Sequence, residues 1–468
     1  MNSFSPEQPA TRAVEFRFDK RWRFVMPNSD VPTYSMAERD RRWELARHFM
    51  DREGLDALLV FGEHEDAGPA PVSYDTWFTN GRPGTTVLFA KNREPISLFP
   101  MELFIMDHLE SSRRGDVMWI PPENVRASRD SRAIVATITE LGLTSGTVGV
   151  VGLEPYPPWY PEGIVPYGLW NKVLAQLPNV EFRPTALAFL RLIMAMGQEE
   201  IAVVRHSARI GDEMVRAMVA AARPGAWESE VYAAAMTAAH TRGTVVPGMH
   251  FWSGPAPAAS GPPQWAYRPQ APRVLRDGDV IRAEVFSHFG GRHTQHQVTI
   301  ALGEVHEDLT RAASVARAAY DAGLRALRPG RKFGEIVEEM RKSVETADGW
   351  VFGPAIHGLN PMIGLSGFPG DISGRPGAEV YPSVPDKTTM LGDMLLEPGM
   401  SFAFEPNYAF GRHLAYLGGT VIVGEDGVIE LNPYTAQILR AGSPDTPQGW
   451  RGPGLDTLPH FENASANP

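Results

Sequence analysis

The 468-residue sequence contains no cysteine. Its absence excludes disulfide bonds, thiolate metal sites, iron–sulfur clusters and a cysteine nucleophile, so any chemistry must use oxygen and nitrogen groups. No segment approaches the roughly 18 apolar residues of a membrane span, and the polar N-terminus lacks the apolar core of a signal peptide. We therefore expect a cytoplasmic protein that does not associate with membranes.

The sequence also has too little positive charge for a nucleic-acid-binding protein. Lys and Arg number 44 against 55 Asp and Glu, which gives a formal net charge of −11 and a pI near 5.7. Neutralising phosphates requires a basic face, so a nucleic-acid partner is excluded. The 43% share of hydrophobic residues is typical of a globular protein, and the length predicts about two domains.

Periodicity and composition divide the chain into four predicted segments. Short apolar runs alternate with helical segments in the first half, which indicates an α/β domain. In the second half, two helices and a strand-rich stretch occur twice in succession. The predicted segments are an N-terminal arm (1–34), the α/β domain (35–190), a domain of two similar halves (197–436) and a polar tail (442–468).

Local signals support the first helix. Ser35 and Glu38 form a capping box, in which the hydroxyl accepts a free helix N–H and the carboxylate reaches back. Gly54 follows as a helix stop. These signals predict a helix over Met36–Glu53.

The most informative segment is a strand pair within residues 277–303 whose turn is Phe-Gly-Gly. Because side chains on a strand alternate between its two faces, the sequence predicts two polar rows on these otherwise apolar strands. Charged and amide groups are costly to bury without partners, so these rows indicate either a polar pocket or a solvated face. The rows are Arg282, Glu284, Phe286 and His288 on the first strand, and His293, Gln295, Gln297 and Thr299 on the second.

Two later segments favour the pocket. GPAIHG places His357 in a Gly-flanked strand or turn, and LEPGMSFAFEP places Glu405 at the end of an apolar run. A lone His or Glu at such a position is usually a hydrogen-bonded core residue. Three such segments in this order are better explained by one shared site.

These segments resemble a known family. The phrases RLIMAMGQEEIAVVRHSARIGDEMV, SGP, DGDVIRAEV, IHG, LEPGMSFAFEP and TVIVGEDG, in that order, are similar to those of peptidase family M24, which includes aminopeptidase P, prolidase and creatinase. The resemblance implies an α+β fold: a pita-bread C-terminal domain preceded by a smaller creatinase-type α/β domain.

The resemblance also shows what has changed at the metal site. Metallopeptidases of this family hold two divalent ions with two Asp, one His and two Glu, whose oxygen ligands suit Mn, Co, Fe or Zn. Two of these carboxylates are absent here, so we do not expect a dinuclear centre. The matching positions are Glu284, Gln295, His357, Glu405 and about Gly418. The hypotheses left open are no metal, or a single divalent ion held by Glu284, His293, His357 and Glu405.

Among the proteins that this sequence resembles, creatinase is a metal-free amidinohydrolase of the same fold, and it uses a His as acid and base. Its hairpin Glu falls at Gln297, and its catalytic His has no aligned counterpart here. His250, in GMHFWSGP, is the nearest substitute, with a structural role as the alternative. The dimethylsulfoniopropionate lyases, another branch of the fold, show that the scaffold also supports elimination.

We therefore predict a small-molecule hydrolase that cleaves a C–N bond (amide, amidine or peptide-like) without the usual two metals. The alternatives are a lyase, an Xaa-Pro peptidase with a reduced metal site, and a non-catalytic binding protein. By resemblance we expect a homodimer, with the loop at 63–68 or the loop near Trp159 covering a pocket. The candidate catalytic residues are His250, Glu284, His357 and Glu405, and the candidate substrate-binding residues are His293, Gln295, Gln297, Trp252, Trp265 and Tyr267.

Overall fold

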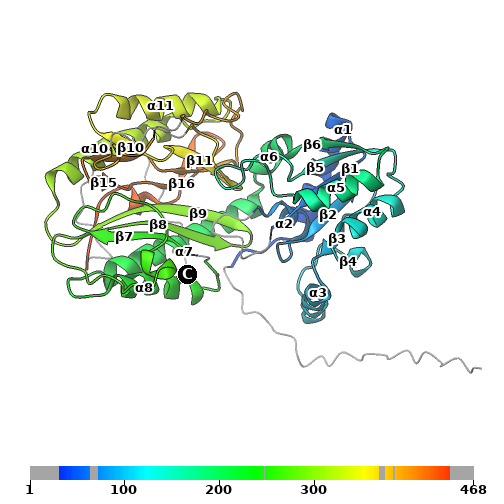
Figure 1. Ribbon diagram of the computed structural model, residues 1–468, viewed down its shortest axis with the longest axis horizontal. Helices are drawn as coiled ribbons and strands as arrows, with labels where there is room; N and C mark the ends of the chain where they lie inside the picture. The colour runs from blue at the N-terminus through cyan, green and yellow to red at the C-terminus, as the bar shows by residue number, and fades with distance from the viewer. Residues whose placement is uncertain (1–30, 64–71, 247, 368–374, 383–384, 443–468) are drawn as a thin grey trace, which may run out of the picture.

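The computed structural model describes residues 31–63, 72–246, 248–367, 375–382 and 385–442. Most of the predicted arm and nearly all of the predicted tail lie outside these ranges. The chain forms two lobes that lie side by side (Figure 1). Within the described ranges, no helix combines the length and the apolar character that crossing a membrane requires.

The N-terminal lobe is built on a mixed six-stranded sheet with the order β4-β3-β2-β1-β5-β6. The short apolar runs near residues 55–62, 85–90, 95–100 and 146–152 form its buried inner strands, as predicted. The strands are β1 (Ala57–Phe61), β2 (Thr86–Ala90), β3 (Ile96–Phe99), β4 (Val125–Ala127), β5 (Thr147–Val151) and β6 (Glu181–Pro184).

Helices pack around this sheet (Figure 1). They are α1 (Met36–Glu53), α2 (Tyr74–Thr79), α3 (Glu102–Arg114), α4 (Ser131–Glu140), α5 (Tyr167–Gln176) and α6 (Ala186–Met194), with a 3-10 turn, η2 (Pro122–Asn124). The predicted bounds of α1 are confirmed, and Ser35 accepts the Glu38 N–H at 3.2 Å. The predicted return bond from Glu38 is wrong, because that carboxylate instead binds the guanidinium groups of Arg41 and Arg42.

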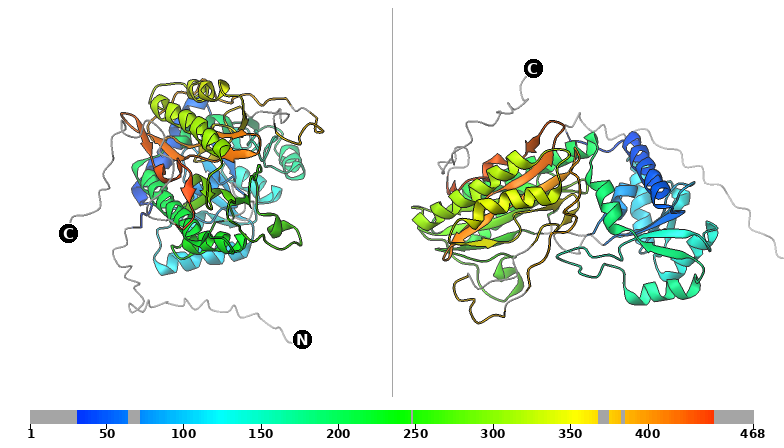
Figure 2. Two further views of the ribbon diagram at one scale, coloured as in Figure 1. Left: turned by 90° about the vertical axis from the view of Figure 1, so that its left-hand side faces the viewer. Right: turned by 90° about the horizontal axis from the view of Figure 1, so that it is seen from above.

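The C-terminal lobe has two halves, each with a helix pair outside and strands inside (Figures 1 and 2). In the first half α7 packs on β8 and β9, and the four-stranded sheet has the order β18-β9-β8-β7. Its elements are α7 (Gln198–Ala221), α8 (Glu228–His240), β7 (His250–Gly254), α9 (Gln264–Tyr267), β8 (Val280–Phe289), β9 (Arg292–Ala301) and β18 (Leu439–Arg440).

The second half packs α10 against β14 and β15. Its strands form a five-stranded sheet, β12-β11-β13-β16-β17, and a three-stranded one, β10-β14-β15. The elements are α10 (Glu307–Ala326), α11 (Phe333–Glu345), β10 (Trp350–Phe352), β11 (Ile356–Leu359), β12 (Met362–Ile363), β13 (Ser401–Phe404), β14 (Asn407–Phe410), β15 (His413–Ala415), β16 (Gly419–Val423), β17 (Val428–Glu430) and η3 (Pro433–Thr435).

The hairpin of β8 and β9 separates an apolar face from a polar one. Ile281, Ala283 and Val285 belong to the hydrophobic core beneath the sheet, while Glu284 and Phe286 line a pocket on the other face. This is the alternation that the sequence predicts. It positions the polar row of β8 toward the second half of the lobe.

A close approach of α7 to the hairpin fixes this arrangement. A Cβ at Gly211 would lie 2.0 Å from Cε1 of His296 on β9, so only glycine fits there. His296 Nε2 lies 3.1 Å from the Asp212 carboxylate.

A buried charged cluster joins the two lobes at the start of α7. Glu200 is fully buried and pairs with Arg41 at 2.5 Å and Arg42 at 3.3 Å, both on α1. It also pairs with Arg292 at the start of β9. Because buried charges require partners, this cluster favours one orientation of the N-terminal lobe over the pocket.

Candidate active site

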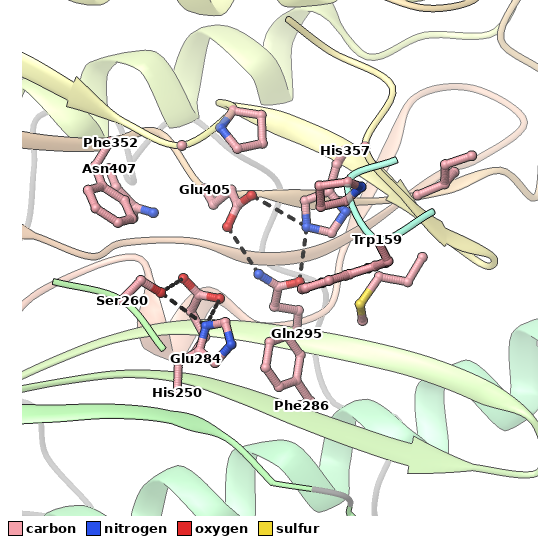
Figure 3. Close-up of a pocket in the computed structure, with 16 residues that line it drawn as sticks. Trp159, His250, Ser260, Glu284, Phe286, Gln295, Phe352, His357, Glu405 and Asn407 are labelled. Atoms are coloured by element: carbon pink, nitrogen blue, oxygen red, sulfur yellow. Dashed lines mark hydrogen bonds and ion pairs between the residues drawn. The ribbon is translucent and has the colours of Figure 1, made fainter. Parts of the chain in front are cut away.

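A cavity of about 210 Å³ lies on the polar face of β8 and β9, bounded by the second half of the lobe and by a loop from the N-terminal lobe. Figure 3 shows its polar side chains pointing toward one another from several strands. Typical sites for drug-sized ligands are roughly 300–1,000 Å³, so this volume favours a small metabolite. The lining residues with polar or aromatic side chains are Trp159, His250, Ser260, Glu284, Phe286, Gln295, Phe352, His357, Glu405 and Asn407.

The first polar group in the cavity is formed by His250, Glu284 and Ser260. His250 and Glu284 are directly opposed in the β7–β8 register, and His250 Nδ1 lies 2.8 Å from Glu284 Oε2. The Ser260 hydroxyl donates to Glu284 Oε1 at 3.1 Å and lies 3.0 Å from the same Nδ1. Both contacts of His250 use Nδ1, so Nε2 is the ring nitrogen that can meet a ligand.

These contacts favour an ion pair. Burial opposes ionisation of Glu284, but the charge and hydrogen bond of His250 outweigh it and lower the pKa of Glu284. Burial also opposes protonation of His250, and the charge and hydrogen bond of Glu284 outweigh it, so the pKa of His250 is raised. At neutral pH the pair therefore favours an imidazolium beside a carboxylate.

The second polar group surrounds Glu405, directly after β13. Gln295 and Gln297, both on β9, donate from Nε2 to Glu405 Oε2 at 3.0 Å and 2.8 Å. His357 on β11 places Nε2 3.4 Å from Glu405 Oε1 and 3.0 Å from Gln295 Oε1. Figure 3 shows this group beside the Glu284 group.

Proton counting shows that His357 and Glu405 share one proton. His357 Nδ1 lies 2.7 Å from the Gly358 carbonyl oxygen, so Nδ1 is the donor in that bond. Nε2 faces two oxygens, so a proton must lie on Nε2 or on Glu405. Burial and the Glu284 charge raise the pKa of Glu405 well above its usual range, and burial lowers the pKa of His357. Burial therefore favours the proton on Glu405, whereas Gln295 Oε1, which can only accept and lies 3.0 Å from Nε2, favours it on His357, so the two groups share it.

The loop near Trp159 covers the cavity from within the same chain. Pro158 and Trp159 line it (Figure 3), and the neighbouring Pro157 carbonyl accepts the Gly364 N–H at 2.9 Å. This bond ties the loop to the C-terminal lobe. The other loop predicted to cover the pocket spans residues 63–68, and its residues 64–68 lie outside the described residues.

Several predicted binding residues lie away from the cavity lining. His293 stacks on His288 with ring centroids 4.3 Å apart, and both its backbone N–H and carbonyl bind Asn360. Burial lowers the pKa of His293 well below its usual range. Trp265 packs edge-on against Tyr232 at 5.4 Å. Trp252 and Tyr267 are not among the lining residues either.

Two residues that line the cavity, Ser260 and Asn407, are not predicted from the sequence. Ser260 lies in an irregular loop without periodicity, so no pattern signalled it. Asn407 lies two residues beyond Glu405 and donates to Gln297 Oε1 at 3.3 Å, and its Oδ1 has no hydrogen-bond partner in the described part of the chain. Its position two residues after Glu405 was the only feature of the sequence that could have suggested Asn407 as a pocket residue.

The residues present do not fit a dinuclear metal centre. The resemblance assigns the last metal-binding Glu to about Gly418, where a Cβ would lie 1.9 Å from the Phe404 carbonyl oxygen, so no side chain fits there. Gln295 supplies a neutral amide, and Glu284 is engaged by His250 and Ser260. Among the described residues, only His306, Asp308 and His413, at the start of α10 and on β15, form a group of three with converging ligand atoms.

Comparison with known proteins shows which proteins this chain is similar to. Residues 202–430 match the sequence model of metallopeptidase family M24. Over 171 residues, 36% of this chain, the sequence is 28% identical to the probable dipeptidase PepE of Mycobacterium tuberculosis, so the chain spans only 40% of that relative's length. Creatinase from Bacillus sp. (strain B-0618) is 23% identical over 421 residues, which cover 86% of this chain and 92% of creatinase.

Solved structures show the same fold. The prolidase of Pyrococcus horikoshii OT3 superposes with a TM-score of 0.62 over 86% of this chain and 99% of that chain, at 15% identity. The dipeptidase PepE of Mycobacterium ulcerans gives 0.63 over 87% and 99%, at 18% identity. These structures confirm the α+β pita-bread fold, and residues 202–430 are similar to the M24 family.

Proposed function

We propose that this protein is a hydrolase that cleaves a C–N bond of a small molecule without a dinuclear metal centre. The observation that supports it most directly is the presence of two His–Glu pairs, His250–Glu284 and His357–Glu405, in one cavity. Their surroundings shift the pKa values of the two pairs in opposite directions. Such a pairing supplies an acid and a base at the same pH. Relatives named dipeptidase, creatinase and prolidase support hydrolysis as the reaction class.

In this proposal the His357–Glu405 pair is the general base. A water molecule attacks the carbon of the C–N bond and gives a proton to the pair, which holds only one proton between Nε2 and the carboxylate. The ionised Glu284 lies close enough to favour a positive charge on His357. The charge formed during the step is thereby stabilised within a buried site.

His250 is the general acid of the proposed reaction. Its imidazolium donates a proton from Nε2 to the leaving nitrogen as the C–N bond breaks. Glu284 holds the ring through Nδ1 at 2.8 Å, as a carboxylate orients a catalytic imidazole. One proton enters the His357 pair and one leaves His250, so the net charge of the cavity is unchanged.

A panel of small amides, amidines and dipeptides, including Xaa-Pro dipeptides, tests the proposal with the full chain. Release of an amine or ammonia is expected, and it should be lost in His357→Asn. Arg311→Gln, at an exposed position of α10, is the control. Unsaturated products without water uptake would instead establish a lyase. Ligand binding without turnover would establish a binding protein.

A further inference from the structure

One end of the cavity is lined by apolar groups from two segments. Pro158 and Trp159 lie on the loop of the N-terminal lobe, and the other groups lie on β12 (Met362–Ile363) and at Gly364 directly after it. The N–H of Gly364 donates to the Pro157 carbonyl at 2.9 Å, so the two segments are in direct contact. Within the described part of the chain, none of the ionisable residues that line the cavity belongs to either segment.

Trp159 has an aromatic surface that is free to contact a bound molecule. The residue is 45% exposed although it lines the cavity, and Trp227, at 46%, is the one other exposed tryptophan among the described residues. Tryptophan is highly buried on average in folded proteins. Ligand pockets are lined mostly by apolar and aromatic side chains, so an exposed tryptophan on the wall of a cavity indicates a position that a ligand covers.

The apolar end lies on the side of the proposed general base. β12 pairs with β11, the strand that carries His357. Figure 3 shows Trp159 on the side of His357 and apart from Ser260. Ser260 lies 3.0 Å from His250, the proposed general acid. In the proposed reaction the attacked carbon faces the His357 pair and the leaving nitrogen faces His250, so the rest of the acyl group extends toward Trp159.

The charges of the cavity lining favour an uncharged group at this end. Glu284 and His250 form an imidazolium beside a carboxylate, and Glu405 and His357 share one proton. Each pair is therefore neutral overall, and neither supplies a net charge that would attract an ion to the apolar end. Burying a charged group among apolar side chains without a partner is costly, so this end is suited to an apolar group.

We propose that Trp159, with Met362 and Ile363, binds an apolar group on the acyl side of the substrate. The inference rests on the proposed function and adds to it a substrate class: small amides whose acyl side carries an uncharged apolar chain of a few carbon atoms. Each methylene group that leaves water at this end strengthens binding. Trp159 is a specificity-determining residue, because it contacts the acyl chain and not the bond that breaks.

Binding of three small amides by the full chain tests this subsite without relying on turnover. Acetamide lacks the chain that butyramide carries, and β-alaninamide has an ammonium group where butyramide has its terminal methyl group. Ligand-observed NMR of the wild type should show that butyramide binds about 10-fold more tightly than acetamide. β-Alaninamide should bind no more tightly than acetamide.

Variants of the two exposed tryptophans assign the preference to one residue. Trp159→Ala should abolish the preference for butyramide over acetamide. Trp227→Ala is the matched control, because Trp227 has nearly the same exposure but does not line the cavity, and it should keep the full preference. Trp159→Phe retains an aromatic face, should keep part of the preference, and serves if Trp159→Ala does not fold.

The possible outcomes separate the subsite from the proposed function. Equal binding of butyramide and acetamide by the wild type, or an unchanged preference in Trp159→Ala, would overturn the subsite. Tighter binding of β-alaninamide than of butyramide would overturn the assignment of an uncharged group. In assays of ammonia release, Trp159→Ala should lower kcat/KM about 10-fold for butyramide and leave that for acetamide unchanged. A binding preference without ammonia release from any amide would reject the proposed hydrolase and leave the subsite standing.

Discussion

Glu284 and Gln297 are directly opposed in the β8–β9 register, yet their side chains bind different partners. Glu284 binds His250 and Ser260, whereas Gln297 donates to Glu405. The hairpin thus supports two separate carboxylates in one cavity. One is held ionised by an imidazolium, and the other is held among amides and an imidazole with which it shares a proton.

His250→Gln should remove the pH dependence that the ion pair contributes to stability. His250 has a pKa raised above 6.5, so its contribution is full below that value and is lost as pH rises through the raised pKa. Glu284 has a pKa lowered below 4.5, so its contribution is lost as pH falls through that lowered value. The two windows overlap between pH 4.5 and 6.5.

Urea unfolding of the wild type and His250→Gln across this range measures the difference. It should be about 1–3 kcal/mol, below the values for fully buried pairs because His250 keeps some contact with solvent. The difference should shrink at pH 9. A difference independent of pH would contradict the ion pair.

Glu405→Gln should strongly reduce turnover while stabilising the protein at neutral pH. The variant removes the group that shares a proton with His357, and kcat should fall by about 100-fold to 10,000-fold. Because the pKa of Glu405 is raised, the native state binds its proton more tightly than the unfolded state, and wild-type stability falls as pH rises above 4.5. The stability of Glu405→Gln relative to the wild type should therefore increase with pH, and a flat difference would refute the assignment.

Gly418→Ala should destabilise the fold by about 2 kcal/mol or more. Its φ is +139°, and the added Cβ would meet the Phe404 carbonyl. Gly411→Ala is the matched control, because its φ is +53° with no atom within 4 Å of an added Cβ. Its cost should be about 1 kcal/mol from backbone strain alone. Equal Tm values for the two variants would show that position 418 has room for a side chain.

Metal analysis of the purified chain should show no tightly held pair of transition-metal ions. Any ion retained after dialysis against a weak chelator should be lost in His413→Asn and kept in His357→Asn, since the converging ligands are His306, Asp308 and His413. If the wild type instead holds two metal ions per chain and His357→Asn loses both, the cavity contains a dinuclear centre.

Some features could be predicted from the sequence because they depend on local periodicity. The two-residue alternation of β8 placed Glu284 and Phe286 on one face and Ala283 in the core. The order of short motifs likewise predicted the pita-bread fold. Gln295, His357 and Glu405 were expected to share a pocket, and they do.

Other features depend on distances between segments far apart in the chain, and only the tertiary structure decides them. His293 shares a predicted face with Gln295, yet it stacks on His288, its directly opposed partner in the β8–β9 register, and its backbone binds Asn360, which is distant in the sequence. Trp159, about 90 residues before His250, reaches the cavity through the loop bond to Gly364. The sequence by itself determined which residue types face the pocket, since a strand's period is local. Packing between strands decided which of them share protons, since burial and distance set the energy of each charge. It also left the Arg282 guanidinium without a hydrogen-bond partner among the described residues.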